Sequence, residues 1–96
     1  MERNRLITVD GQTLRDLEAL HDGFAPLFPA GYGRNLDALY DCLTDLGEDV
    51  TVTLRHPQAL AERFGLRGRA LAALLRRAAE ENTHVRLLEE PEESGA

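Results

Sequence analysis

Hydrophobic residues follow two different spacings along this chain. Three short segments, at 5–9, 50–54 and 84–88, are rich in β-branched and other apolar residues, a pattern typical of strands. In the two long intervals between them, apolar residues recur every three or four positions, as in helices that bury one face. The pattern therefore predicts the order strand, two helices, strand, two helices, strand.

The first interval is expected to hold two helices joined by a loop. Thr13 is a favourable N-cap for a helix that reaches Phe24. Residues 25–34 contain two prolines and two glycines and are expected to form the loop. Asn35 is then expected to cap a second helix, with leucines at spacings of three, four and three, and Gly47 is expected to end it.

The second interval predicts a short helix over 57–64, which Gly65 closes, and a longer helix over about 68–82. Strands that alternate with helices favour a parallel sheet joined by right-handed crossovers. We therefore expect an α/β fold in which about four helices pack against a three-stranded parallel sheet, in two or three layers. A single domain is expected over 1–89, followed by an acidic, disordered tail over 90–96.

Composition narrows the class of protein. The chain has 96 residues, of which 43% are hydrophobic and 29% charged, values typical of one globular domain. No apolar run approaches the ~20 residues of a membrane-spanning helix, and the first residues lack the apolar stretch of a secretory signal. The single cysteine, Cys42, excludes an internal disulfide and a multi-thiolate metal site. The cytoplasm is the expected location, with no membrane partner.

Charge is distributed unevenly along the chain. The net charge is −6, from 11 arginines and 17 acidic residues, and lysine is absent. The first 48 residues carry four arginines against nine acids, and residues 35–49 hold five acids and no base. Phosphate contacts require basic residues, so no nucleic-acid partner is expected. A chain of this kind is better suited to a basic protein surface.

The acids concentrate on one face of the second predicted helix. Its leucines face the core, whereas the opposite face carries, at spacings of four, four and three, Asp37, Asp41, Asp45 and Glu48. Like charges at such spacings cost roughly 0.2–0.5 kcal/mol each in an isolated helix, and acids near the C-terminal end oppose the helix dipole. The face is either an ordinary solvated surface or a binding surface, and the spacing alone leaves both interpretations open.

The residues around this face also match a known family. Residues 32–44, Tyr-Gly-Arg-Asn-Leu-Asp-Ala-Leu-Tyr-Asp-Cys-Leu-Thr, closely resemble the signature of barstar-type ribonuclease inhibitors, Tyr-Gly-x-Asn-Leu-Asp-Ala-Leu-Trp-Asp-Cys-Leu-Thr. Arg34 occupies the variable position, and Tyr40 stands where the pattern has Trp. The resemblance extends more weakly over 5–89, with the same order of strands and helices.

The resemblance implies a function as well as a fold. Barstar-like proteins have a three-stranded parallel sheet packed by helices, and they plug the basic active-site cleft of a small, secreted, guanyl-preferring ribonuclease. A one-to-one complex without a cofactor is expected. By position, Asp41 matches the carboxylate that takes the place of a substrate phosphate, Asp37 a second carboxylate at the cleft rim, and Thr44 a minor contact. The implied contact residues are Gly31, Tyr32, Gly33, Asn35, Leu36, Asp37, Ala38, Tyr40, Asp41, Thr44 and Asp45.

Four further positions depart from the barstar pattern. Gly31 stands where barstar has an aromatic residue, and Asp45 and Leu46 stand where it has Gly and Trp. On the last helix, Arg77 aligns with an acidic contact residue, which reverses the charge. These changes are expected to alter which partner the protein binds more than its role as an inhibitor.

Metal binding and catalysis find little support in the residues. Aspartates spaced by four on one convex helix face point the same way and do not surround a metal ion, since a hard cation prefers about six or more oxygen ligands. Paired catalytic carboxylates would have to face each other across a cleft. The histidines His21, His56 and His84 lie in different elements, with no paired nucleophile. We therefore expect no metal site and no enzyme.

Two other interpretations concern binding. The arginines over 67–77 form a basic cluster that could contact RNA. The last two, Arg76 and Arg77, are each followed four residues later by a glutamate and are expected to form ion pairs with it. The alternative to a ribonuclease inhibitor is an acidic adapter that binds another basic protein or toxin.

Overall fold

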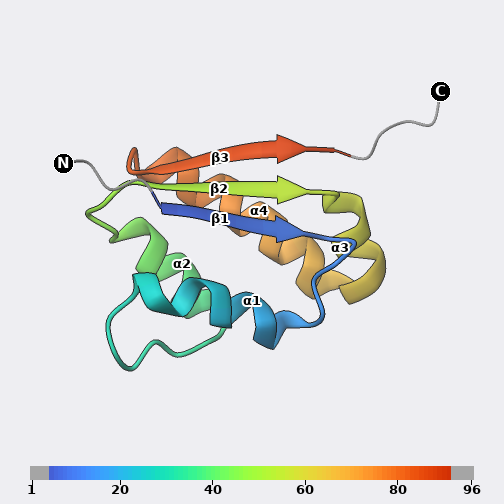
Figure 1. The fold of residues 1–96 in the computed structure, drawn as a ribbon, viewed down its shortest axis with the longest axis horizontal. Coiled ribbons are helices and arrows are strands. Elements are labelled where there is room, and N and C mark those ends of the chain that lie inside the picture. The colour runs from blue at the N-terminus through green and yellow to red at the C-terminus, as the bar shows by residue number, and fades with distance from the viewer. Residues whose placement is uncertain (1–4, 92–96) are drawn as a thin grey trace.

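Three parallel strands in the order β1–β2–β3 form the centre of the fold, which the computed structural model describes for residues 5–91 (Figure 1). Ile7, Val52 and Leu87 lie side by side in the register of the sheet. The predicted α/β class, with a three-stranded parallel sheet and four helices, is confirmed. The elements are β1 (Arg5–Asp10), α1 (Leu17–Phe24), the 3-10 turn η1 (Ala25–Leu27), α2 (Leu36–Thr44), β2 (Val50–Arg55), α3 (Pro57–Phe64), α4 (Leu66–Glu81) and β3 (Val85–Glu90).

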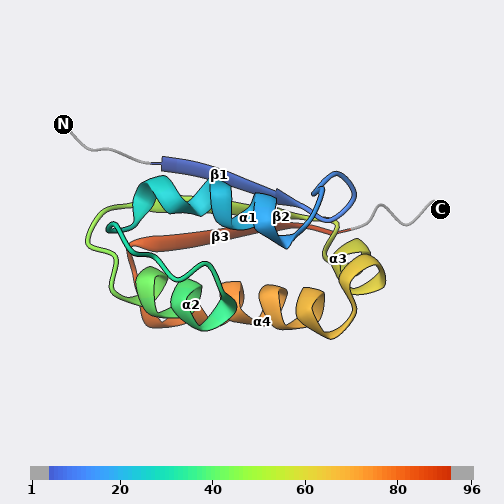
Figure 2. The same cartoon turned by 90° about the horizontal axis from the view of Figure 1, so that it is seen from below.

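The helices cover only one face of the sheet, so the fold has two layers (Figures 1 and 2). Alternate residues of β2 (Val50, Val52 and Leu54) point into this layer and are at most 1% exposed. On the other face, Leu6 of β1 is 75% exposed and Leu88 of β3 is 49% exposed. Parallel sheets are usually covered on both faces, and here the second face is left uncovered.

Leucine fills most of the space between the sheet and the helices, since only 5% of the residues are aromatic. α2 contributes Leu39 and Leu43 to this core, and both are 0% exposed. The other helical residues that are 0% exposed are Phe24, Leu60, Leu71, Leu75 and Ala78. Burial of each of these leucines contributes roughly 1.5–3 kcal/mol, so the position of α2 is fixed mainly by its two leucines.

The first helix begins later than predicted. The backbone N–H of Thr13 donates to the carbonyl of Asp10 at 3.2 Å, so Thr13 belongs to the turn after β1 and is not an N-cap. Asp16 caps α1 instead, because its Oδ1 accepts from the backbone N–H of Ala19 at 2.7 Å. The last helix starts earlier than predicted, directly after Gly65, whose φ of 63° ends α3 and reverses the chain into α4.

Two other predicted boundaries change. α2 ends at Thr44 and not at Gly47. β3 spans Val85–Glu90, one residue beyond the predicted end of the folded domain, and its last glutamate pairs with Arg55 at 2.9 Å. Of the predicted tail, residues 92–96 lie outside the described residues.

The end of α2 depends on a buried amide that the sequence analysis did not identify. Asn82 is 8% exposed, and its Nδ2 donates to the carbonyls of Leu43 at 2.8 Å and Leu46 at 2.9 Å. Its Oδ1 accepts from the backbone N–H of His84 at 3.0 Å. The last carbonyls of a helix have no partner within the helix. The amide of Asn82 donates to one carbonyl in the last turn of α2 and to one just beyond it, and it also joins α2 to the start of β3.

Two helical glycines are expected to respond in opposite ways to alanine. A Cβ on Gly68 of α4 would lie 2.0 Å from the carbonyl oxygen of Leu60 in α3, whereas a Cβ on Gly23 of α1 would meet no heavy atom within 4 Å. Gly68→Ala should lower the free energy of unfolding by about 1–3 kcal/mol, because α3 and α4 must move apart. Gly23→Ala should raise it by up to about 1 kcal/mol through helix propensity.

Denaturant unfolding of both variants measures these changes. Each variant is the control for the other, since the chemical change is identical and both positions are helical. Equal shifts in the two variants would contradict the close approach of α3 and α4 at Gly68.

Candidate functional site

Helix α2 presents its carboxylates on the face that points away from the core. Asp37 and Asp41 lie on the helix and Asp45 is its C-cap, and all three are exposed. On the other side of the helix, Leu39 and Leu43 are fully buried. The exposed acids are therefore carried by an element that the core holds in place.

The carboxylates of Asp37, Asp41 and Asp45 differ from most other acids because no basic side chain within residues 5–91 forms an ion pair with them. Glu48, predicted to continue the same row, lies beyond the end of α2, and its carboxylate is 4.0 Å from Arg5. The other acids with an arginine or histidine partner are Asp10, Asp16, Glu18, Asp22, Asp49, Glu81, Glu89 and Glu90.

The start of α2 is fixed by a side-chain cap, as predicted. The Oδ1 of Asn35 accepts from the backbone N–H of Ala38 at 2.8 Å, and its Nδ2 donates to the carbonyl of Gly33 at 3.3 Å. One side chain thus bonds to both the helix and the loop that precedes it. An N-cap of this kind stabilises a helix by about 1 kcal/mol.

Arg34 clamps this loop onto α1. Its guanidinium is 2.9 Å from Glu18 and also pairs with Asp22. Its φ is 55°, in the left-handed region that non-glycine residues rarely adopt. Gly31, with φ 92°, makes the other left-handed turn in the loop. Sequence reasoning missed this clamp, since Arg34 occupies the variable position of the motif and its partners lie 12 and 16 residues earlier.

The loop is also held by a buried histidine. His21 of α1 is 4% exposed, and its Nδ1 lies 2.5 Å from the hydroxyl of Tyr32, whose ring packs edge-on against Phe28. Burial, followed by the nearby charge of Arg34, lowers the pKa of His21 below its ordinary value of 6.5. Burial raises the pKa of Tyr32 to about 12. At neutral pH, the hydrogen bond therefore joins an uncharged imidazole to a protonated phenol.

The predicted contact residue Tyr40 connects α2 to α4. Its hydroxyl donates to the carboxylate of Glu81, and the guanidinium of Arg77 lies 5.8 Å from the centre of its ring. The predicted pair between Arg77 and Glu81 is confirmed at 3.3 Å. Arg76 instead pairs with Glu89 at 2.7 Å and not with the glutamate four residues on, because β3 runs beside α4.

Cys42 lies beside the acids of α2 and is partly buried. Burial, together with the charges of Asp41 and Asp45, raises the pKa of its thiol above the ordinary value. The thiol is therefore protonated at neutral pH and is a poor nucleophile.

A hollow of about 550 Å³ runs along α2 between the helix and the turn η1. Asp41 and Asp45 line one side, and Leu27, Phe28 and Pro29 line the other. This arrangement gives the carboxylates an apolar border on one side.

The predicted contact residues lie in α2, at its two caps and in the loop before it, and they differ in what they expose. Four side chains use their polar groups internally. The amide of Asn35 and the hydroxyls of Tyr32 and Tyr40 bond as described above, and the hydroxyl of Thr44 donates to the carbonyl of Tyr40 at 3.0 Å. The partly buried members are Tyr32, Leu36, Ala38, Tyr40 and Thr44, and the exposed members are Gly31, Gly33, Asn35, Asp37, Asp41 and Asp45.

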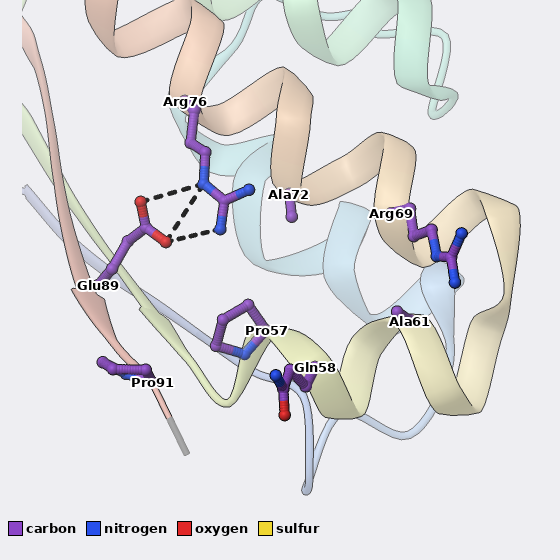
Figure 3. Close-up of a pocket in the computed structure, with 8 residues that line it drawn as sticks. All are labelled: Pro57, Gln58, Ala61, Arg69, Ala72, Arg76, Glu89 and Pro91. Carbon is purple, nitrogen blue, oxygen red and sulfur yellow. Dashed lines mark hydrogen bonds and ion pairs between the residues drawn. The ribbon is translucent and has the colours of Figure 1, made fainter. Parts of the chain in front are cut away.

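A second hollow, of about 560 Å³, lies between α3, α4 and the end of β3, and no residue of α2 lines it (Figure 3). Arg76 and Glu89 bond to each other there, and the remaining wall is largely formed by Pro57, Ala61, Ala72 and Pro91. Of its three charged residues, Arg76 and Glu89 neutralise each other and Arg69 is left over. The row of unpaired acids on α2 is therefore the stronger candidate site.

Two further observations concern the described part of the chain. Over residues 5–91, no group of three histidine, cysteine or acidic side chains is arranged to hold a metal ion. No helix in the same range is long and apolar enough to cross a membrane.

The fold and the site together describe a small α/β domain that carries a row of exposed acids on one helix, and this row is suited to contact with a basic protein surface. The chain matches the family model described as "Barstar (barnase inhibitor)" over residues 4–90, nearly its whole length. It therefore belongs to the barstar family, whose members are protein inhibitors and not enzymes. The sequence-based resemblance is confirmed.

A curated relative carries a name of the same kind. The chain is 52% identical over 42 residues to the "Putative ribonuclease inhibitor YrdF" of Bacillus subtilis (strain 168). The match covers 42% of this chain and 46% of the relative, so it spans about half the length of either protein.

The buried His21 should make the fold sensitive to mild acid. Its lowered pKa means that the unfolded chain takes up a proton near pH 6.5 while the folded chain resists it. The free energy of unfolding should therefore fall as the pH decreases below about 6.5, by at most about 1.4 kcal/mol per pH unit for one group. Denaturant unfolding between pH 7.5 and 5.5 measures this slope.

Two variants distinguish the effect of the buried imidazole on the pH dependence of stability from the effect of the other contacts in the loop. His21→Gln should reduce the slope, whereas Tyr32→Phe should lower stability at every pH and keep the slope. A slope that is the same in His21→Gln as in the natural protein would exclude His21 as its source.

Proposed function

We propose that this chain inhibits a small, guanyl-preferring ribonuclease of the barnase type, as a one-to-one complex in the cytoplasm of the cell that makes it. α2 and the loop before it enter the active-site cleft of the enzyme and block access to RNA. The observation that carries this proposal is the row of Asp37, Asp41 and Asp45, which is exposed and has no ion pair within residues 5–91.

The mechanism is charge mimicry. A ribonuclease cleft must hold a polyanion, so it is lined with basic side chains that have no counter-charge when the cleft is empty. The carboxylate of Asp41 takes the position of a substrate phosphate and accepts charge-assisted hydrogen bonds there. Asp37 pairs with basic groups at the rim, and Asp45 extends the acidic surface.

Rigidity of the helix adds to affinity. The cap at Asn35 and the amide of Asn82 hold the two ends of α2, and Arg34 holds the loop. A surface that is already ordered loses little conformational entropy on binding. Gly31 and Gly33 expose the loop backbone, which lets it approach the enzyme closely.

The competing interpretation is an adapter for a basic protein that is not a nuclease. A titration of ribonuclease activity against several guanyl-preferring enzymes distinguishes the two. Inhibition at a one-to-one ratio supports the proposal. Capture of a basic, non-nuclease protein at stoichiometric yield, without inhibition of any enzyme tested, would overturn it.

Asp41→Ala should separate binding from stability. Alanine is the better helix former, and the change removes repulsion from the acids four residues away on either side, so the free protein should be equally stable or gain about 0.5–1 kcal/mol. The complex should lose roughly 2–5 kcal/mol, because several basic groups of the enzyme remain buried and unpaired. The melting temperature and the inhibition constant of each variant measure the two effects.

Two controls carry the same loss of charge. Asp45→Ala should give a similar gain in stability and a smaller loss of inhibition, since Asp45 lies outside the matched motif. Glu62→Ala, at an exposed position of α3, should leave inhibition unchanged. Destabilisation of the fold by Asp41→Ala, with inhibition intact, would show that Asp41 is structural.

Association should be accelerated by charge. Attraction between the acidic surface and a basic cleft should make the association rate fall as ionic strength rises, since the screening length shortens from ~10 Å at 0.1 M salt to ~3 Å at 1 M. Dissociation should depend less on salt. Stopped-flow measurement at several salt concentrations checks both rates, and an association rate independent of salt would contradict the proposed interface.

A further inference from the structure

Most arginines of the described chain are neutralised within the protein, and Arg67 is an exception. It is exposed and forms no ion pair with any residue from 5 to 91. It also lies in the first turn of α4, where the helix dipole disfavours a positive charge. The N-cap, Gly65, provides no side-chain hydrogen bond there. Arg67 therefore contributes no evident stability to the fold.

The position of Arg67 connects it to the proposed binding surface. It lines a hollow of about 290 Å³ together with Asn35 and Leu36, which begin α2 and belong to the predicted contact residues. Glu18 and Arg34 also line this hollow, but their charges are paired with each other at 2.9 Å. Of the two arginines that line this hollow, Arg67 is therefore the one without an ion pair within residues 5–91, and it lies beside an otherwise acidic surface.

We propose that this hollow receives a carboxylate side chain of the ribonuclease that binds α2, and that Arg67 pairs with it; this inference rests on the proposed function. The planar guanidinium can bind both oxygens of a carboxylate. An unpaired arginine pressed against a basic rim would weaken the complex, so Arg67 selects enzymes that carry an acid at this place and rejects those that carry a base.

The direction in which inhibition changes distinguishes a specific ion pair at Arg67 from a general effect of net charge. Arg67→Glu and Arg86→Glu each change the net charge by the same amount, and Arg86 lies on the uncovered face of the sheet, away from the hollow. If only net charge mattered, both variants would bind a basic enzyme faster than the natural protein. The proposal requires Arg67→Glu to weaken inhibition tenfold or more, while Arg86→Glu leaves it unchanged or strengthens it.

The experiment uses the guanyl-preferring ribonuclease that the natural chain inhibits most strongly, with barnase included in the panel. Inhibition constants are measured for the natural chain and for Arg67→Ala, Arg67→Glu and Arg86→Glu. Acidic residues on the rim of that enzyme are then changed one by one to arginine. One of these changes should weaken binding to the natural chain and restore binding to Arg67→Glu.

Each outcome has a separate meaning. If the natural chain inhibits the enzyme but Arg67→Glu behaves like Arg86→Glu, or no change on the enzyme restores binding, this inference is wrong and the proposed function stands. If the natural chain inhibits no enzyme, the proposed function fails, and this inference fails with it. Melting temperatures of the variants, expected to match the natural protein, show that the effects come from binding.

Discussion

The side-chain amide of Asn82 joins the parts of the molecule on which the acidic surface depends. It donates to carbonyls at the end of α2, accepts from the backbone before β3, and stands at the end of α4. α2 has nine residues, too few to be stable as an isolated helix. The direction of its carboxylates therefore follows from this amide and from the burial of Leu39 and Leu43. An apolar side chain in place of Asn82 would remove the side-chain donor that these carbonyls share.

The protein divides its negative charge into two groups with different consequences. Acids on α1, β1 and β3 have basic partners from other elements, whereas those on α2 have none within residues 5–91. Adjacent like charges on α2 cost some stability in the free protein. In the proposed complex, a basic cleft would supply the missing counter-charges, and the repulsion that lowers the stability of the free protein would then favour binding.

Membership of the barstar family agrees with a site on the exposed face of a helix. An enzyme gathers its reactive groups in a concave pocket that excludes water, whereas here the acids stand on an exposed helix beside a braced loop. Arg34, Tyr32 and His21 hold this loop in place without occupying its outer surface. The two-layer arrangement, with the helices on one side of the sheet, leaves α2 at the outside of the helical layer and accessible to a partner (Figure 2).

Local patterns in the sequence determined the elements and the acidic face. Short runs of β-branched and other apolar residues specified the three strands, and the leucine spacing specified α2. The cap at Asn35 and the row of exposed aspartates could also be predicted, because they depend on residues no more than four positions apart. Tertiary structure decided which polar groups meet. Asn82 reaches a carbonyl 39 residues away, Tyr32 bonds to a residue 11 positions earlier, and Arg76 pairs with β3 and not with its own helix. These contacts depend on how the elements pack. The spacing of residues along the chain does not show which distant residues will meet. The same reason explains Arg67: the sequence shows an arginine in a basic cluster, and only the fold brings it to the start of α2.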